Sequence, residues 1–268
     1  MSLNETAHPY TMEALRAKKG YIIDMDGVIY HGNMLLPGVE RFVDFLKKND
    51  KRFLFLTNSS ERAPRELQQK LARLGLDVDE SHFYTSAMST AAFLKGQCPG
   101  GSVYAIGEPG LFGALYDAGF TMNEVNPDYV VLGETHTYNY EKIERAVQLV
   151  LDGAKLIGTN PDLTGPIENG IAPACKALIA PIELATGHSA YFLGKPNPLM
   201  MRHGLRRLGV STDEAAIIGD RMDTDVIAGV ESGIDTVLVL SGVTSREEMS
   251  KFPYRPRYVL NGVGDVVG

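Results

Sequence analysis

Short apolar segments alternate with amphipathic segments along most of this chain. Segments rich in Val, Ile, Leu, Phe and Tyr predict strands at 21–24, 52–56, 102–106, 128–132, 154–158, 189–193, 215–218 and 235–240. Residues 37–49 and 140–152 have apolar side chains at helical spacing, and Pro37 is suited to the first turn of its helix. This alternation predicts an α/β protein with a mostly parallel sheet.

Polar residues able to do chemistry stand at the ends of four predicted strands. They are Asp24, Thr57, Lys195 and Gly219-Asp220. Ligands of open α/β sheets bind beyond the carboxyl ends of the strands, so we expect these side chains to converge on one crevice. Segment 84–188 shows no strand end of this kind. It is therefore expected to be a second α/β unit, inserted between the second and third of these positions.

Composition narrows the class of protein. The 268 residues suggest one or two domains, and the 44% apolar and 22% charged residues are ordinary for a globular protein. No apolar run is long enough to cross a bilayer, and the N-terminus has no secretory pattern. Cys98 and Cys175 have no CxxC spacing, which argues against zinc and disulfide frameworks. A reducing cytoplasm is the expected location.

The formal net charge is −7, and no basic stripe appears. These features argue against a nucleic acid polymer as a partner. An acidic protein can still bind a small anion, but a metal ion, a lysine or a helix N-terminus must supply the positive charge locally.

The first motif is Asp24-Met25-Asp26-Gly27-Val28. Residues i and i+2 of an extended chain point to the same side, so Asp24 and Asp26 are expected to face one site. Two close carboxylates repel each other unless a cation or a proton intervenes. Gly27 permits a turn after the strand. Taken alone, a turn with solvated acids remains an equal alternative.

Two motifs offer groups that bind anions. Thr57-Asn58-Ser59-Ser60 places a hydroxyl at a strand end before a predicted helix 61–74, although plain N-capping by Ser59 or Ser60 also accounts for it. Gly194-Lys195-Pro196 holds a lysine between Gly and Pro, which suits a fixed charge on phosphate. A surface charge is the alternative for Lys195.

The last motif runs from Gly219 to Asp225. Its carboxylates Asp220, Asp223 and Asp225 stand at the start of a predicted helix 223–232 and suggest a site for a hard cation. Favourable charge at the helix N-terminus is the alternative, and Asp223 needs no other explanation.

Together, the four motifs resemble those of the haloacid dehalogenase superfamily. The matching residues are Asp24-Met25-Asp26, Thr57, Lys195, and Gly219-Asp220 with Asp225. The chain is more closely similar to subfamily IIA, the NagD type, which has an α/β cap between the second and third motifs. Further matching segments are 77–94, 125–140, 159–162, 173–175 and 238–243. The resemblance extends from about residue 20 to the end.

This resemblance implies a fold and its domains. We expect a Rossmann-like three-layer α/β/α core with a parallel sheet, formed by 1–83 and 189–268, plus a smaller inserted α/β cap, 84–188. The cap would close over the site, exclude water and select the leaving group.

The resemblance also implies a Mg²⁺-dependent phosphomonoesterase for nucleotide or sugar phosphates. Asp24 is the implied nucleophile, which forms an aspartyl phosphate. Asp26 is the implied acid for the leaving oxygen and then the base for water. The implied Mg²⁺ ligands are Asp24, the Asp26 carbonyl and Asp220.

Other residues receive implied supporting roles. Thr57 and Lys195 would hold the phosphoryl oxygens, and the main-chain amides of Gly27 and Asn58 would contact phosphate. Asp225 would orient Lys195 or a water ligand of the ion.

The cap supplies candidates for recognition of the leaving group: Glu134, Asn160, Asp162 and Lys176. Lys176 departs from the family pattern, in which a small residue commonly follows the PAC-like segment 173–175. Substrate inference from relatives is weaker for that reason. Alternatively, Lys176 is a solvated residue on a predicted helix 173–186.

Two other functions compete with this one. One is phosphoryl transfer to a sugar by a phosphomutase of the same superfamily, although mutases usually carry a small helical cap. The other is a catalytically inert binding scaffold, which the retention of Asp24, Asp26, Thr57, Lys195 and Asp220 disfavours. The physiological ester and the oligomeric state, with a homodimer as one option, stay open.

Overall fold

The computed structural model of the protein describes residues 10–167 and 170–268. The chain divides into two compact units, Met1–Phe55 with Gly204–Gly268 and Leu56–His203. This division differs from the predicted core and cap, whose boundaries at 83/84 and 188/189 stay a prediction. The expected lack of a secretory signal falls mainly on residues 1–9, outside the described part. Within the described ranges, no helix has the length and apolar character needed to cross a membrane.

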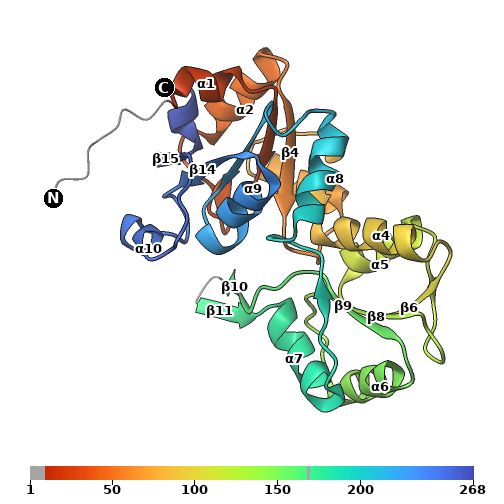
Figure 1. The fold of residues 1–268 in the computed structure, drawn as a ribbon. Helices are drawn as coiled ribbons and strands as arrows, with labels where there is room; N and C mark the ends of the chain where they lie inside the picture. The colour runs from red at the N-terminus through yellow and green to blue at the C-terminus, as the bar shows by residue number, and fades with distance from the viewer. Residues whose placement is uncertain (1–9, 168–169) are drawn as a thin grey trace. The chain divides into compact units, whose positions relative to one another are not determined.

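The first unit is built on a parallel sheet (Figure 1). Its strands are β1 (Gly20–Ile23), β2 (Tyr30–His31), β3 (Met34–Leu35), β13 (Ala215–Gly219), β14 (Asp235–Val239) and β15 (Tyr258–Leu260). Its helices are α1 (Met12–Ala17), α2 (Val39–Lys48), η2 (Met222–Val226), α9 (Ile227–Ser232), α10 (Arg246–Ser250) and η3 (Val263–Val266). Strand β4 (Arg52–Thr57) and helix α8 (Pro198–Leu208) each cross a boundary between the units. The strands β15, β14, β13, β1 and β4 are parallel neighbours in this order, and β2 pairs with β3.

The apolar segments of the first unit form its buried strands and the buried face of helix α2. Strands β1, β13 and β14 are buried along their whole length, as is typical of parallel strands covered on both faces. Helix α2 buries Phe42 and its apolar neighbours on one stripe, and the Phe42 ring meets Tyr21 edge-on at 6.3 Å between centroids. The predicted helix 37–49 is confirmed, but Pro37 precedes it, because Gly38 with φ of 81° is the N-cap.

The second unit has its own parallel sheet, in the order β12-β9-β8-β6-β7. Its strands are β5 (Phe83–Thr85), β6 (Ser102–Ile106), β7 (Thr121–Met122), β8 (Tyr129–Leu132), β9 (Lys155–Gly158), β10 (Thr164–Ile167), β11 (Gly170–Pro173) and β12 (Tyr191–Phe192). Its helices are α3 (Pro64–Arg73), η1 (Glu80–His82), α4 (Ser86–Gln97), α5 (Pro109–Asp117), α6 (Tyr140–Leu151) and α7 (Cys175–Thr186). Strands β10 and β11 form an antiparallel pair.

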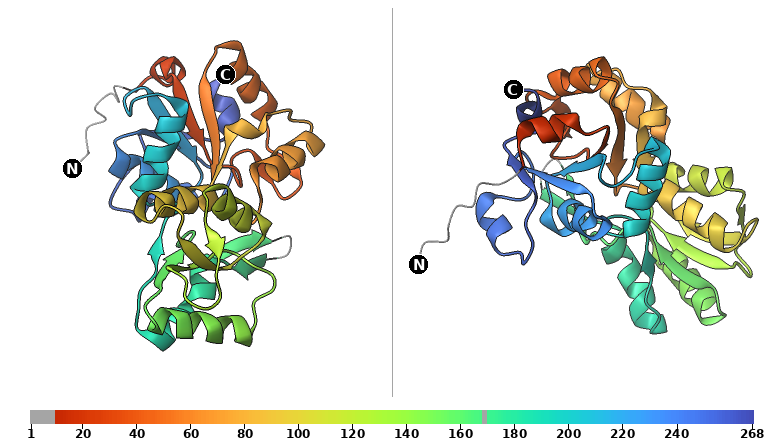
Figure 2. Two further views of the ribbon diagram at one scale, coloured as in Figure 1. Left: turned by 90° about the vertical axis from the view of Figure 1, so that its right-hand side faces the viewer. Right: turned by 45° about the horizontal axis from the view of Figure 1, so that its top comes forward.

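Alternate side chains of this second sheet pack in two different cores. Val130 and Leu132 pack with residues of α6 and α7, whereas Val131 packs with residues of α4 and α5. This is the period of two expected for a strand between two layers. The left view of Figure 2 shows the helices of these two layers on opposite sides of the strands. Both units therefore confirm the predicted α/β class with parallel sheets and flanking helices.

Some predicted elements differ from the observed ones. Predicted strand 189–193 is reduced to Tyr191–Phe192, and the β10–β11 pair was not predicted. Predicted helix 61–74 begins only at Pro64, with Ala63 as N-cap and the Glu66 carboxylate accepting from Ala63 N–H at 2.8 Å. N-capping by Ser59 or Ser60 is therefore wrong.

Candidate active site

The first part of the candidate site lies at the carboxyl ends of β1 and β13. Ile23 pairs with Ile218, and the next residue, Asp24, donates its N–H to the Ile218 carbonyl at 2.8 Å. Asp220 directly follows Gly219, the last residue of β13. The parallel register therefore brings Asp24 and Asp220 to the same edge of the sheet, as their positions in the sequence predicted.

Asp24, Asp220 and Asp225 form a carboxylate cluster. Each offers an oxygen that lies within 4.8 Å of those of the other two. Asp220 and Asp225 are buried, and Asp24 is partly exposed. Close carboxylates with restricted access to water repel each other unless a cation lies among them or one is protonated. An all-oxygen donor set of this kind fits a hard divalent cation.

Backbone groups and glycines hold the Asp220 carboxylate. Its Oδ2 accepts from Val243 N–H at 2.7 Å, and its main-chain carbonyl accepts from Thr244 N–H at 3.1 Å. A Cβ on Gly27 or Gly242 would overlap this carboxylate. Gly27 also has φ of +75°, which favours glycine. The sequence predicts a turn at Gly27, but only the structure shows that its missing side chain makes room for Asp220.

Asp225, the third member of the cluster, lies in a π-helical turn. The N–H groups of Asp225 and Val226 both donate to the Arg221 carbonyl, and residues 222–226 form a π-helix. The helix predicted over 223–232 is therefore an α-helix only from Ile227. The Asp225 Oδ2 accepts from Arg221 N–H at 3.2 Å. A Cβ on Gly219 would overlap the Asp225 side chain, so this close approach requires glycine.

The remaining residues of these two motifs have other surroundings. Met25 is buried and Asp26 is exposed, and Asp26 bridges to Tyr30 in the backbone. The Gly27 N–H donates to the Tyr30 carbonyl at 2.9 Å, and the contact with phosphate that the resemblance implies for it stays a prediction. Asp223 is exposed and pairs with Arg221 at 2.8 Å, which supports its interpretation as an ordinary helix-end charge.

The second unit contains the other predicted phosphate-binding residues. Thr57 ends β4, and its Oγ1 accepts from Ser59 N–H at 3.1 Å. Asn58 pairs with the main chain of Lys195: its Oδ1 accepts from Lys195 N–H at 2.7 Å, and its Nδ2 donates to the Lys195 carbonyl at 3.0 Å. Lys195 is buried, with 2% of its surface exposed, so the surface-charge alternative is wrong.

Two polar residues follow strands of the segment that was predicted to lack such ends. Glu134 follows β8 by way of Gly133, and Asn160 follows β9 by way of Thr159. The prediction for 84–188 was wrong on this point. The Glu134 carboxylate accepts from Ser60 N–H at 3.1 Å, from the Ser60 hydroxyl and from the Asn160 amide. The pair Gly133-Glu134 after a strand, which resembles Gly219-Asp220, was the overlooked signal.

The residues around the N-terminus of α7 range from exposed to fully buried. Lys176 is exposed in the first turn of the helix, and its N–H donates to the Asp162 carbonyl at 3.0 Å. Asp162 also accepts from Asn58 Nδ2 at 2.9 Å. The adjacent Cys175 is fully buried, and burial raises the pKa of its thiol to about 12. A thiol of this kind is protonated at neutral pH, which argues against cysteine chemistry.

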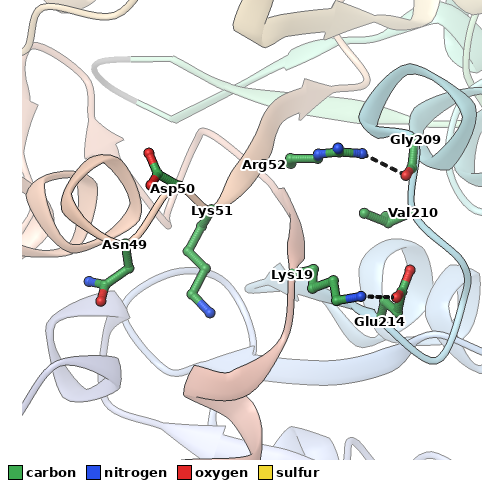
Figure 3. Close-up of a pocket in the computed structure, with 8 residues that line it drawn as sticks. All are labelled: Lys19, Asn49, Asp50, Lys51, Arg52, Gly209, Val210 and Glu214. Carbon is green, nitrogen blue, oxygen red and sulfur yellow. Dashed lines mark hydrogen bonds and ion pairs between the residues drawn. The ribbon is translucent and has the colours of Figure 1, made fainter.

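A cavity of about 460 Å³ lies elsewhere in the first unit (Figure 3). Its lining residues include Lys19, Arg52 and Glu214, at the amino ends of β1, β4 and β13. Lys19 pairs with Glu214, and the Arg52 guanidinium donates to the carbonyls of Leu208 and Gly209. The cavity is thus at the opposite strand ends from Asp24 and Asp220. The charged groups of Lys19, Arg52 and Glu214 thus bind one another or main-chain carbonyls.

Comparisons with known proteins agree with the motifs. A family model described as haloacid dehalogenase-like hydrolase matches residues 21–121, and a second model of HAD hydrolase-like proteins matches 192–266. Dihydroxyacetone phosphatase of Corynebacterium glutamicum is 46% identical over 246 residues, which cover 92% of this chain and 90% of the relative. Ribonucleotide monophosphatase NagD of Escherichia coli is 40% identical over 248 residues, which cover 92% of this chain and 98% of NagD.

Solved structures support the same relation. The structure of NagD from Escherichia coli K-12 matches with a TM-score of 0.88 at 39% identity, over 93% of this chain and 98% of that one. Glycerol phosphate phosphatase of Mycobacterium tuberculosis, solved in complex with magnesium, matches with a TM-score of 0.89 at 28% identity, over 94% of this chain and 77% of that one. The predicted resemblance is thereby confirmed, and the chain belongs to the haloacid dehalogenase-like hydrolase family as a phosphatase of the NagD type.

Proposed function

We propose that the protein hydrolyses phosphate monoesters of small metabolites, either sugar phosphates or nucleotides, through an aspartyl phosphate on Asp24. The single observation that carries the proposal is the carboxylate cluster of Asp24, Asp220 and Asp225 at the carboxyl ends of β1 and β13. The names of the relatives, a dihydroxyacetone phosphatase and a ribonucleotide monophosphatase, support both substrate classes.

The metal in this proposal is Mg²⁺. The cluster fits it because all its donors are carboxylate oxygens, and Asp220 and Asp225 are buried. The ligands would be the carboxylates of Asp24 and Asp220 and the Asp26 carbonyl, with Asp225 orienting the groups around them. When bound, Mg²⁺ supplies positive charge against the carboxylates and the phosphoryl oxygens.

The covalent steps use two aspartates. A carboxylate oxygen of Asp24 attacks phosphorus, the bond from phosphorus to the leaving oxygen breaks, and Asp26 gives that oxygen its proton. Asp26 then takes a proton from water, whose oxygen attacks phosphorus, and the bond from phosphorus to Asp24 breaks. The products are the alcohol and inorganic phosphate, and Asp24 and Asp26 return to their starting states.

Thr57, Lys195 and the Asn58 amide are the proposed phosphate-binding groups. The Lys195 ammonium and the Thr57 hydroxyl would offset the negative charge that moves between oxygens as the bonds break. The burial of Lys195 supports this role, because a lysine inside a protein needs a negative partner, whether a protein group or a bound phosphate.

Phosphoryl transfer by a mutase is less well supported. Segment 84–188 contains the parallel strands β6, β7, β8 and β9 between two layers of helices. A mutase of this superfamily would be expected to carry a small helical cap instead.

The test is the variant Asp24→Asn, assayed with p-nitrophenyl phosphate and Mg²⁺. An amide cannot serve as the attacking oxyanion, so turnover should fall below about a hundredth of wild type while the circular dichroism spectrum is retained. Residual turnover above that level would contradict a nucleophilic role. Phosphate release from dihydroxyacetone phosphate, other sugar phosphates and ribonucleoside monophosphates then ranks the substrate classes.

A further inference from the structure

Four segments that are distant in the sequence meet in one hydrogen-bonded network in the second unit. They are the loop 57–60, the segment 133–134 after β8, the turn 159–162 and the loop 194–195. The network begins at Glu134, a partly exposed residue whose carboxylate accepts from the Ser60 N–H, the Ser60 hydroxyl and the Asn160 amide. Ser60 and Asn160 are both fully buried.

Asn160 links Glu134 to the main chain of Asn58. Its Nδ2 donates to Glu134 Oε1 and to the Asn58 carbonyl, the latter at 2.7 Å, and its Oδ1 accepts from Asp162 N–H at 3.1 Å. The two hydrogens of the amide thus have two acceptors, and its oxygen has a donor. This arrangement fixes the orientation of the Asn160 side chain.

Asn58 in turn holds Lys195. Its side-chain amide pairs with both the N–H and the carbonyl of Lys195, at 2.7 and 3.0 Å, much as a neighbouring strand would. Gly194 allows this approach, because a Cβ there would lie 2.7 Å from Asn160 Cβ and 2.7 Å from Asn58 Oδ1. The main chain that carries the Lys195 side chain is therefore tied, through Asn58 and Asn160, to the Glu134 carboxylate.

We propose that Glu134 is a positioning residue for Lys195, which it holds in place through Asn160 and Asn58. The inference rests on the proposed role of Lys195 in binding the phosphoryl group. It gives Glu134 and Asn160 a role in the catalytic step, whereas the resemblance makes them candidates for recognition of the leaving group. Misplacement of a catalytic group by about 1 Å can cost about a hundredfold in rate, so the effect is measurable.

Burial and hydrogen bonding act on the Glu134 carboxyl in opposite directions. Burial raises the pKa of the Glu134 carboxyl above its ordinary value, while hydrogen bonds from Ser60 and Asn160 act in the opposite direction. The hydrogen bonds from Ser60 and Asn160 favour the ionised carboxylate, which is the form that accepts from these donors, whereas burial opposes ionisation.

The experiment is a double-mutant cycle with Glu134→Gln and Lys195→Ala, assayed with p-nitrophenyl phosphate. Gln keeps the shape of Glu but cannot accept from both donors of Ser60 and from Asn160 together. We expect Glu134→Gln to lower kcat/KM by about ten- to a hundredfold in the native background. In the Lys195→Ala background it should change kcat/KM by less than about twofold, because there is no ammonium left to position.

Tyr138→Phe is the matched control. Tyr138 donates its hydroxyl to the Leu178 carbonyl in the same unit, outside the network, so the variant loses a hydrogen bond of similar burial. The kcat/KM of Tyr138→Phe should stay at the native value, even if this variant and Glu134→Gln lower the Tm by the same amount. Asn160→Ser, which cuts the link between Glu134 and Asn58, replaces Glu134→Gln in the cycle should the latter not fold.

The outcomes separate the two proposals. Lys195→Ala with native activity would refute the proposed role of Lys195 itself. If Lys195→Ala is impaired, an unchanged kcat/KM in Glu134→Gln would overturn the positioning role. So would a loss of equal size in both backgrounds, which would indicate that Glu134 acts independently of Lys195.

Discussion

The acidic residues of the last motif differ in function because their surroundings differ. Asp220 is buried, accepts from Val243 N–H and lies in the cluster with Asp24 and Asp225. Asp223, only three positions further, is exposed and paired with Arg221. The sequence alone offers all three carboxylates as possible cation ligands but already allows Asp223 to be an ordinary charge at a helix N-terminus, which its exposure and its pairing with Arg221 support.

We predict that Asp220→Ala mainly impairs the Mg²⁺ dependence of activity. The substitution removes a carboxylate from the small donor set, so the Mg²⁺ concentration for half-maximal turnover should rise by more than about tenfold. Activity with p-nitrophenyl phosphate, titrated with Mg²⁺, measures the change. Asp223→Ala is the control and should titrate as the native protein does; an Asp220→Ala curve identical to the native one would remove Asp220 from the proposed site.

At the scale of elements, two of the three carboxylates in the cluster, Asp24 and Asp225, are positioned by different kinds of local structure. Asp24 follows a buried strand whose parallel pairing sets its place, and a strand end can be recognised from the sequence. Asp225 depends on a π-helical turn over 222–226 and on the missing side chain of Gly219. The sequence of 223–232 predicts a plain helix. A local pattern cannot show that the Asp225 carboxylate packs against Gly219 of the preceding strand.

We predict that Gly219→Ala destabilises the first unit. The added methyl group would overlap the Asp225 side chain, and overpacking of this kind typically costs about 1–3 kcal/mol. Urea denaturation measures the free energy of unfolding. Gly113→Ala is the control: this glycine lies exposed inside α5 with no atom within 4 Å of the added Cβ. It should gain about 0.5–1 kcal/mol, and the same sign for both variants would refute the packing argument.

The contrast between local patterns and contacts across distant segments explains what the sequence could and could not predict. The parallel strands, the helices at 37–49 and 140–152, and the positions of Asp24 and Asp220 follow from local patterns and strand ends. The network from Glu134 to Lys195 joins four segments, and no local pattern indicates which side chains meet across them. The sequence offers N-capping by Ser59 or Ser60 as an alternative, because serine is a preferred N-cap, but Ser60 is fully buried and bonds Glu134.

At the scale of the whole molecule, the net charge of −7 opposes the binding of an anionic substrate. Positive charge must therefore be supplied locally, and the proposed suppliers are the cation at the carboxylate cluster and the buried Lys195. Neither distinguishes one phosphate ester from another, because both would act on the phosphoryl group that all substrates share. Selection among esters requires groups that contact the rest of the substrate.

Lys176 is the residue we propose for this selection. It is exposed in the first turn of α7, and a helix N-terminus favours anions. The positive charge of Lys176 at this end of the helix carries a penalty of about 0.3–1 kcal/mol, which a bound anion would offset. If it meets a second polar or anionic group of the substrate, Lys176→Ala should raise KM for the preferred ester by about tenfold, which corresponds to ~1.4 kcal/mol. KM for p-nitrophenyl phosphate, which has no such group, should stay unchanged. Lys155→Ala, another exposed lysine of the same unit, is the control. Equal changes in KM for both substrates, or no change for either, would leave Lys176 as an ordinary solvated charge.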